Sequence, residues 1–192
     1  MRPPRLSPAT DVRRLIANLD LSVDGVTENP AGWMPVRHPD ADAFVQDVMR
    51  HTDTLLLGRT TYEHLAAHWP TQPPGSSWIA DFVNGTPRAV VSRTLKEPAW
   101  VGTTVLPDLE GVAALKQQDG GHIVTLGSVT LLGALAGAGL IDEYQLWLHP
   151  LLHGGGHPLF PTDLKQSLTL LEARSFPDGL LLLRYAPQGG TP

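Results

Sequence analysis

The chain has 192 residues, of which 42% are hydrophobic and 17% charged, so it is long and apolar enough to bury the core of one domain. Its 14 lysines and arginines against 19 aspartates and glutamates give a net charge of −5, which argues against general nucleic-acid binding. The absence of cysteine excludes disulfides, thiol nucleophiles and thiolate metal sites. This composition is compatible with the reducing cytoplasm, where we expect the protein to reside.

The ends of the chain differ in composition from the rest. Residues 1–11 are rich in proline and arginine and no apolar stretch follows them, so we expect a mobile tail there and not a secretory signal. The predicted domain covers residues 12–187, and residues 188–192 form a second tail. An uncharged stretch over residues 123–141 has the length of a membrane span, but a Gly-Ser pair interrupts it and acidic residues flank it. We therefore expect no membrane span.

Apolar runs and turn residues alternate regularly up to residue 150. Strands are predicted over residues 13–22, 54–57, 88–92, 103–106, 122–126, 144–149, 168–176 and 180–185. Helices are predicted over residues 40–49, 60–68, 77–84, 108–118 and 129–138. This alternation favours parallel pairing with helices on both faces, and the last two strands form a hairpin across a Pro-Asp-Gly turn. The pattern predicts a three-layer α/β fold with a mostly parallel eight-stranded sheet and a C-terminal antiparallel hairpin.

Three predicted strands end in residues that suit an anion. The junctions are Gly58, Arg59, Thr60 and Thr61; Ser92, Arg93 and Thr94; and Gly127, Ser128, Val129 and Thr130. Each alone is a weak signal, because a Gly-Ser turn before a helix more often only caps it, and Thr60 and Glu63 form a capping box by their spacing. The carboxyl ends of parallel strands share one edge, however, so we expect the junctions to converge on a polyphosphate ligand. Neither a P-loop nor a Rossmann fingerprint is present.

Four segments also carry a family resemblance. They are Ser-Val-Asp-Gly-Val at residues 22–26, the Gly-Arg-Thr-Thr-Tyr-Glu run within residues 56–63, Val-Val-Ser-Arg-Thr-Leu at 90–95, and the long block from 120 to 160. With their spacing, which covers about residues 13–186, the sequence resembles the dihydrofolate-reductase-like superfamily, in the branch related to the reductase domain of the bifunctional riboflavin-biosynthesis deaminase/reductase. The resemblance implies that fold, a homodimer, and an NADPH-dependent reductase of a small heterocycle of pterin, flavin-precursor or pyrimidinone type.

The resemblance also implies roles for the three junctions. It places Gly58, Arg59, Thr60 and Thr61 at the phosphates, Ser92 and Arg93 at the adenosine 2′-phosphate, and Gly127, Ser128, Val129 and Thr130 over the pyrophosphate. Two arginines near a 2′-phosphate favour NADPH over NADH, because NADH would leave their charges unpaired.

Candidates for the substrate side follow from the first strand and the loop after it. Asp24 is our candidate for substrate orientation or proton handling, with a raised pKa in a half-closed pocket; alternatively, Asp24 and Gly25 only form a turn. Trp33 would either stack on a flat heterocycle or pack. Asp20 stands where the family has an apolar or small residue. Three interpretations of Asp20 are open: it is a functional acid, a buried group that needs a partner, or a sign that the pocket has changed. Asn18 replaces the lysine of the riboflavin-pathway reductases.

Other functions stay open on the sequence alone. His149, His153 and His157 recur every four residues, but Pro150 and the glycines after it prevent a helix there, so we expect no metal. A catalytically silent nucleotide-binding or ligand-sensing homodimer that retains the fold is the alternative to a reductase. A structural dimer without a cofactor is the third possibility.

Overall fold

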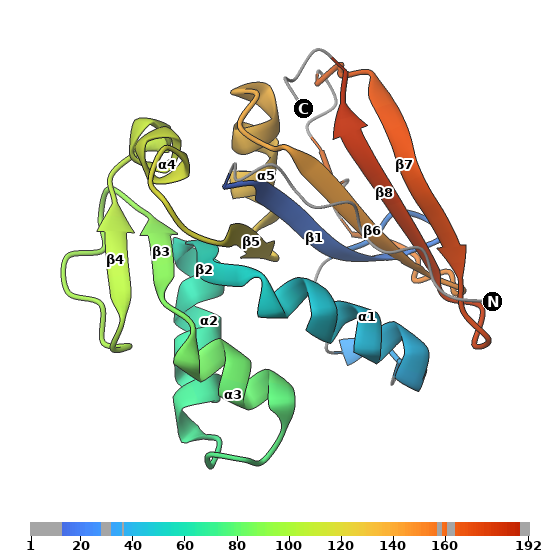
Figure 1. The fold of residues 1–192 in the computed structure, drawn as a ribbon, viewed down its shortest axis with the longest axis horizontal. Helices are drawn as coiled ribbons and strands as arrows, with labels where there is room; N and C mark the ends of the chain where they lie inside the picture. The colour runs from blue at the N-terminus through green and yellow to red at the C-terminus, as the bar shows by residue number, and fades with distance from the viewer. Residues whose placement is uncertain (1–12, 28–31, 36, 157–158, 161–163, 189–192) are drawn as a thin grey trace.

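The computed structural model describes residues 13–27, 32–35, 37–156, 159–160 and 164–188 (Figure 1). The predicted N-terminal tail and all but the first residue of the predicted C-terminal tail lie outside these ranges. The strands are β1 (Leu15–Ser22), β2 (Thr52–Gly58), β3 (Arg88–Val91), β4 (Thr103–Leu106), β5 (His122–Leu126), β6 (Glu143–His149), β7 (Leu168–Ser175) and β8 (Leu181–Pro187). The helices are α1 (Pro39–Arg50), α2 (Arg59–His68), α3 (Trp78–Gly85), α4 (Leu109–Lys116) and α5 (Val129–Gly137), with a 3₁₀ turn, η2, at Trp69–Thr71.

All eight strands join one sheet in the order β4-β3-β2-β5-β1-β6-β8-β7. The pairs from β4 to β6 are parallel, whereas β8 pairs antiparallel with β6 and with β7. Helices α4 and α5 lie on one face and α1, α2 and α3 on the other (Figure 1). The predicted fold is therefore confirmed, including the C-terminal hairpin.

The central strands are buried on both faces, which explains their continuous apolar runs. In β2, Leu55, Leu56 and Leu57 are all fully buried. Leu56 packs in the cluster that includes α5, while Leu55 and Leu57 pack on the other side with Tyr62 of α2 and Val83 of α3. Strand β2 is thereby fixed between two layers, and so is the position of the junction that follows it.

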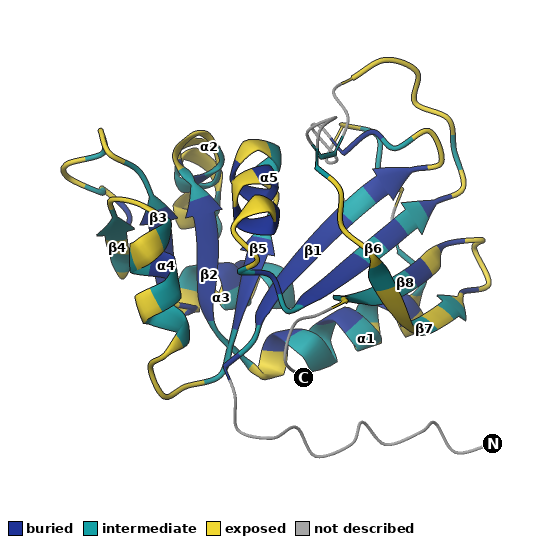
Figure 2. Ribbon diagram, turned by 90° about the horizontal axis from the view of Figure 1, so that it is seen from above, coloured by how far each residue is buried: buried dark blue, intermediate teal, exposed yellow. Residues whose placement is uncertain are grey.

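The far end of the sheet is covered less completely. Half-buried and exposed residues run along β7 and β8, and no helix of the described part of the chain lies over these strands on the α5 side (Figure 2). Leu170 of β7 and Leu181 of β8 are 52% and 36% exposed. This end of the sheet thus presents an apolar strip, which we call the β7–β8 strip and define by Leu170, Leu181 and Leu183.

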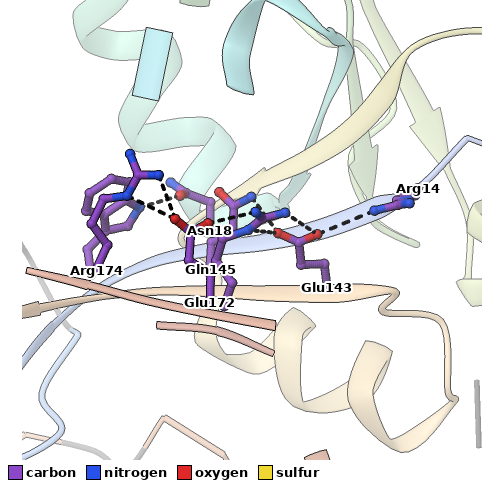
Figure 3. A network of polar contacts seen from close by, with 8 residues as sticks. Arg14, Asn18, Glu143, Gln145, Glu172 and Arg174 are labelled. Carbon is purple, nitrogen blue, oxygen red and sulfur yellow. Dashed lines mark hydrogen bonds and ion pairs between the residues drawn. The ribbon is translucent and has the colours of Figure 1, made fainter. Parts of the chain in front are cut away.

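A network of charged side chains crosses β6, β8 and β7 on the α1 side (Figure 3). Arg184 donates to both carboxylate oxygens of the buried Glu143, from Nε at 2.6 Å and from Nη2 at 3.0 Å. It also donates to Glu172, which accepts a further hydrogen bond from Arg174. The buried carboxylate is compensated by this bidentate pair, so losing one partner is costly.

No helix in the described ranges is long and apolar enough to cross a membrane. The uncharged stretch over residues 123–141 divides into β5, a turn and α5.

We predict that Glu143→Leu lowers the free energy of unfolding by about 3 kcal/mol, because it leaves the Arg184 guanidinium without its buried partner. Urea denaturation followed by circular dichroism measures this. The double variant Glu143→Leu/Arg184→Leu should recover most of the loss. A single variant within about 0.5 kcal/mol of wild type would contradict the assigned role of the pair.

Candidate functional site

The three predicted junctions meet at the carboxyl edge of the sheet. The Gly58 N–H, at the end of β2, donates to Ser128 Oγ, after β5, at 2.8 Å. Arg59 Nη1 donates to Thr94 Oγ1, beyond the end of β3, at 2.6 Å. Residues 58–61, 92–94 and 127–130 therefore form one group, which we call the junction cluster.

Helix α2 enters this cluster without a capping side chain. Its N-cap is Gly58, which has no side chain to accept from the first-turn N–H groups. The predicted capping box of Thr60 and Glu63 is wrong: Glu63 accepts from Arg59 Nε at 2.7 Å instead. The helix begins two residues earlier than the box requires, at Arg59, and Glu63 lies one turn from Arg59 as its ion-pair partner. Thr60 is exposed and Thr61 half-buried in the first turn.

Helix α5 also begins without a side-chain cap, although its N-cap residue has a hydroxyl. Ser128 has φ 70° and ψ 62°, and its Oγ accepts the hydrogen bond from Gly58 instead of capping its own helix. It is the one non-glycine residue with positive φ in the described ranges. Gly127, also at positive φ, lies against Thr61, since a Cβ on Gly127 would be 3.6 Å from Thr61 Cγ2. Val129 and Thr130 are the first two residues of the helix.

The remaining α-helices all carry a side-chain cap. His38, Ser77 and Asp108 accept from the first-turn N–H groups of α1, α3 and α4. Only α2 and α5 lack one among the α-helices described, and these two begin side by side in the junction cluster. The N–H groups and the positive ends of two helix dipoles thus lie at one place.

The third junction contributes an arginine. Ser92 Oγ accepts from the N–H groups of Thr94 and Leu95 at 3.2 and 3.0 Å, so this hydroxyl tightens the turn after β3. Arg93 follows, is exposed, and makes no hydrogen bond or ion pair with a described residue. Its guanidinium is available to an anion.

A second group of polar side chains lies near the carboxyl ends of β1 and β6, the two strands that follow β5 in the sheet order. Asp20 of β1 accepts from Arg37 Nη2 with both oxygens at 2.7 Å, and its Oδ1 lies 2.8 Å from His149 Nε2 of β6. Burial alone would raise the pKa of Asp20, but the hydrogen bond from His149 and the charge of Arg37 outweigh it and lower this pKa below its ordinary value. Of the three alternatives for Asp20, the structure shows a largely but not fully buried carboxylate with partners. We call these three residues the Asp20 cluster.

Trp33 covers this cluster. Its ring lies edge-on to His149 and His153, with centroids 5.6 and 5.8 Å apart, and the side chain is half-buried. Trp33 therefore packs against the imidazoles at the end of β1 and β6, where a flat ring would find an aromatic neighbour.

The expected raised pKa of Asp24 is wrong. The Ser22 hydroxyl donates to Asp24 Oδ1 at 2.6 Å, and the N–H groups of His153 and Gly154 donate to its two oxygens at 3.0 and 2.7 Å. These donors lower the pKa of Asp24 far below its ordinary value, with the Ser22 hydroxyl as the largest cause. Asp24 is exposed and ionised, and it joins the loop after β1 to the loop after β6.

Sequence reasoning missed Arg37 and His149 as members of a site. A signal was present. Asn18 and Asp20 are two residues apart in a mostly apolar strand, and Gln145 and His149 are four apart in a second strand, so each pair points to one face of its strand. Alternate polar residues on two strands that pair side by side point to a polar group on one face. The pairing itself, Asn18 with Gln145 and Ser22 with His149, is not visible without the structure.

No group of three or more histidine, aspartate or glutamate side chains suited to a metal occurs in the part of the chain that the structure describes. His157, the third histidine of the predicted loop, lies outside it.

The sheet order and the paired helix starts define an α/β protein of the dihydrofolate-reductase-like class. A solved structure from Shewanella sp. PV-4, assigned to riboflavin biosynthesis, superimposes with a TM-score of 0.71 at 22% identity and covers 91% of this chain and 99% of its own. Dihydrofolate reductase from Enterococcus faecalis, complexed with NADP(H) and RAB-propyl, superimposes with a TM-score of 0.61 at 17% identity over 91% of this chain and 96% of its own.

The family follows from the sequence match. Residues 13–182 match the model of the RibD C-terminal domain, and the chain belongs to that family. The uncharacterized protein YyaP from Bacillus subtilis is 29% identical over 181 residues, which are 90% of this chain and 94% of YyaP. The resemblance drawn from the sequence motifs is thereby confirmed.

We predict that Asp24→Asn loosens the loop after β6, because an amide NH₂ replaces one of the two accepting carboxylate oxygens and the negative charge is lost. Amide hydrogen exchange at His153 and Gly154 should become severalfold faster. In the wild type the protection of these amides should persist down to strongly acidic pH. A carboxyl group whose pKa is lowered by folding stabilises the folded state at pH values above its unfolded pKa. This stabilisation is lost as the pH falls through the folded pKa. Unchanged exchange in the variant would show that the carboxylate does not hold the loop.

Proposed function

We propose that the protein is an NADPH-dependent reductase of a small heterocyclic substrate. The observation that carries this proposal is the junction cluster: two neighbouring helices, α2 and α5, begin there without a capping side chain, and Ser128 is held in a left-handed conformation between them. Such backbone strain is costly and is concentrated at functional sites. Membership of the RibD C-terminal domain family supports the same function.

The residues of the junction cluster fit a diphosphate. The first-turn N–H groups of α2 and α5 would donate to its oxygens, at Arg59, Thr60 and Thr61 on one side and at Val129 and Thr130 on the other. Gly58 and Gly127 keep the backbone open, since a Cβ on Gly58 would lie 3.1 Å from Ser128 Oγ. When bound, NADPH would supply the hydride that the substrate receives.

The end of β3 would recognise the adenosine 2′-phosphate. Arg93 is exposed and has no partner among the described residues, so a phosphate there would gain a charge-assisted hydrogen bond without breaking another contact. Ser92 would contribute through the turn that its hydroxyl closes.

The substrate side would lie at the ends of β1 and β6. Trp33 would stack against the heterocycle beside the Asp20 cluster. Asp24 would act by positioning, since its carboxylate holds the two loops that flank this place. Reduction of a small heterocycle is compatible with the cytoplasmic location that we expect from the composition.

Titration of the protein with NADPH, followed by quenching of tryptophan fluorescence, tests the proposal. We expect saturable binding in the micromolar range, and oxidation of NADPH at 340 nm when a dihydropterin, a flavin or an aminopyrimidinedione is added. No binding of NADPH would contradict the reductase. Binding without turnover on any of a broad set of heterocycles would favour the catalytically silent nucleotide-binding protein.

We predict that Arg93→Ala weakens NADPH binding by about 10-fold to 100-fold, as expected for the loss of one charge-assisted phosphate contact, and leaves NADH binding nearly unchanged. Lys96→Ala is the matched control, because Lys96 is an exposed cation three residues further along the same loop. Equal losses for the two cofactors would reject the 2′-phosphate assignment of Arg93.

We also propose that the protein forms a homodimer through the β7–β8 strip. Leu170 and Leu181 expose apolar surface on a sheet face that none of the described helices covers at this end, and β7 is an edge strand.

Leu170→Glu should therefore shift the protein from dimer to monomer in sedimentation equilibrium. Val101→Glu is the control, because Val101 is 90% exposed in the loop between β3 and β4, away from the strip. A monomeric wild type, or a Leu170→Glu variant that stays dimeric, would remove the strip as the interface.

A further inference from the structure

The Asp20 cluster lies at the same edge of the sheet as the junction cluster. Asn18 of β1 pairs with Leu126, the last residue of β5, so Asp20 stands two residues further along, level with the turn at Gly127 and Ser128. His149 is the last residue of β6 and pairs with Ser22. Neighbouring strands are about 4.8 Å apart, which places Asp20 about one strand spacing and His149 about two from the end of β5.

The order of the strands gives a bound dinucleotide a direction. Arg93 follows β3, the paired helix starts follow β2 and β5, and the Asp20 cluster follows β1 and β6; the sheet runs in the order β3-β2-β5-β1-β6. If the 2′-phosphate meets Arg93 and the diphosphate meets the helix starts, the nicotinamide end extends toward Asp20 and His149.

The hydrogen bonds of the cluster fix which imidazole nitrogen exchanges a proton. Asp20 accepts from Arg37 with both oxygens and is ionised, so it can only accept from His149 as well. His149 Nε2, 2.8 Å from Asp20 Oδ1, therefore carries a hydrogen. A proton that the imidazole transfers to another group is therefore the one on Nδ1.

The surroundings of His149 are nearly closed and contain few charges. His149 is 1% exposed and the Asp20 side chain 13%. The charged and titratable groups facing it are Asp20 from β1, Arg37 from the segment before α1, and His153 from the loop after β6, across the ring of Trp33. The charges of Asp20 and Arg37 cancel, so the proton on His149 sets the net charge of the cluster.

We propose that His149, oriented by Asp20, donates the proton that balances hydride transfer; this rests on the proposed function. A carbon of a substrate C=N or C=O bond receives the hydride from the cofactor. The electron pair of the π bond takes the proton from His149 Nδ1, forming the new N–H or O–H bond. His149 becomes neutral and regains a proton from water that reaches the site once the product has left. Arg37 keeps Asp20 ionised and is a positioning residue.

A purely structural Asp20–His149 pair makes a different prediction about one substitution. In His149→Gln the amide NH₂ can still donate to Asp20, but it has no titratable proton. A structural role therefore expects full activity in this variant. A proton-donating role expects a loss of about 100-fold or more in kcat, because general acid catalysis contributes about 10² to 10⁴ in rate.

The location is tested without any substrate. Imidazole signals of His149, assigned by their absence in His149→Gln, are followed by NMR while NADPH or adenosine 2′,5′-bisphosphate is added. We expect both ligands to shift the amide signals of Gly127 and Ser128, and NADPH alone to shift His149. If both shift those amides and neither shifts His149, the inference fails while the proposed cofactor site stands. If NADPH shifts neither, the proposed function fails, and the inference with it.

The chemistry is tested with whichever of a dihydropterin, a flavin or an aminopyrimidinedione is reduced. His149→Gln should keep the wild-type Kd for NADPH and lower kcat by about 100-fold or more. General acid catalysis makes the wild-type rate fall as pH rises, and the residual rate of the variant should not show this fall. His64→Gln is the control, because His64 is exposed on α2 and should leave the pH profile unchanged. A His149→Gln variant with wild-type kcat and pH profile would overturn the proposal.

Discussion

The chain leaves β5 and enters α5 with Ser128 in a left-handed conformation, and the arrangement of the candidate site depends on that turn. The strain is compensated by one hydrogen bond, in which the Gly58 N–H donates to Ser128 Oγ and ties the ends of β2 and β5 together. A left-handed non-glycine residue costs about 1–2 kcal/mol, comparable to the contribution of one such bond. Because the hydroxyl is used across the junction, α5 is left without its cap, and Gly58 has no side chain to cap α2.

The two halves of the site are built on different physical principles. The junction cluster is made of backbone N–H groups, helix dipoles and the guanidinium of Arg93, which has no partner among the described residues. Such groups suit a negatively charged ligand. The Asp20 cluster is nearly buried, and its charges compensate one another before any ligand arrives. Asp24 adds a third component by tying the loop after β1 to the loop after β6. A cofactor would gain its affinity at the first place, while the second would control protons near the reacting carbon.

Much of this organisation could be predicted from the sequence, because it is local. The Gly-Arg-Thr-Thr and Gly-Ser-Val-Thr junctions follow apolar strands, and the parallel sheet brings such ends to one edge regardless of detail. Strand β1 is marked by its apolar run, helix α3 by its N-cap Ser77, and the hairpin by Gly179, a turn residue with φ 83°.

What sequence reasoning missed depends on contacts between distant residues. The pKa of Asp24 is lowered first by the Ser22 hydroxyl and then by backbone N–H groups about 130 positions away, and nothing near Asp24 marks these distant groups. The partners of Asp20 come from β6 and from the segment before α1, so a lone acid in a strand had three open interpretations. The capping box at Thr60 and Glu63 failed because α2 begins at Arg59, which recruits Glu63 as an ion-pair partner.

A crystal structure of the protein with NADPH tests the central claim most directly. The claim predicts that the diphosphate lies between the first turns of α2 and α5, with its oxygens within hydrogen-bond distance of N–H groups in residues 59–61 and 129–130. A diphosphate bound elsewhere, or a saturated crystal in which these N–H groups face only water, would contradict it.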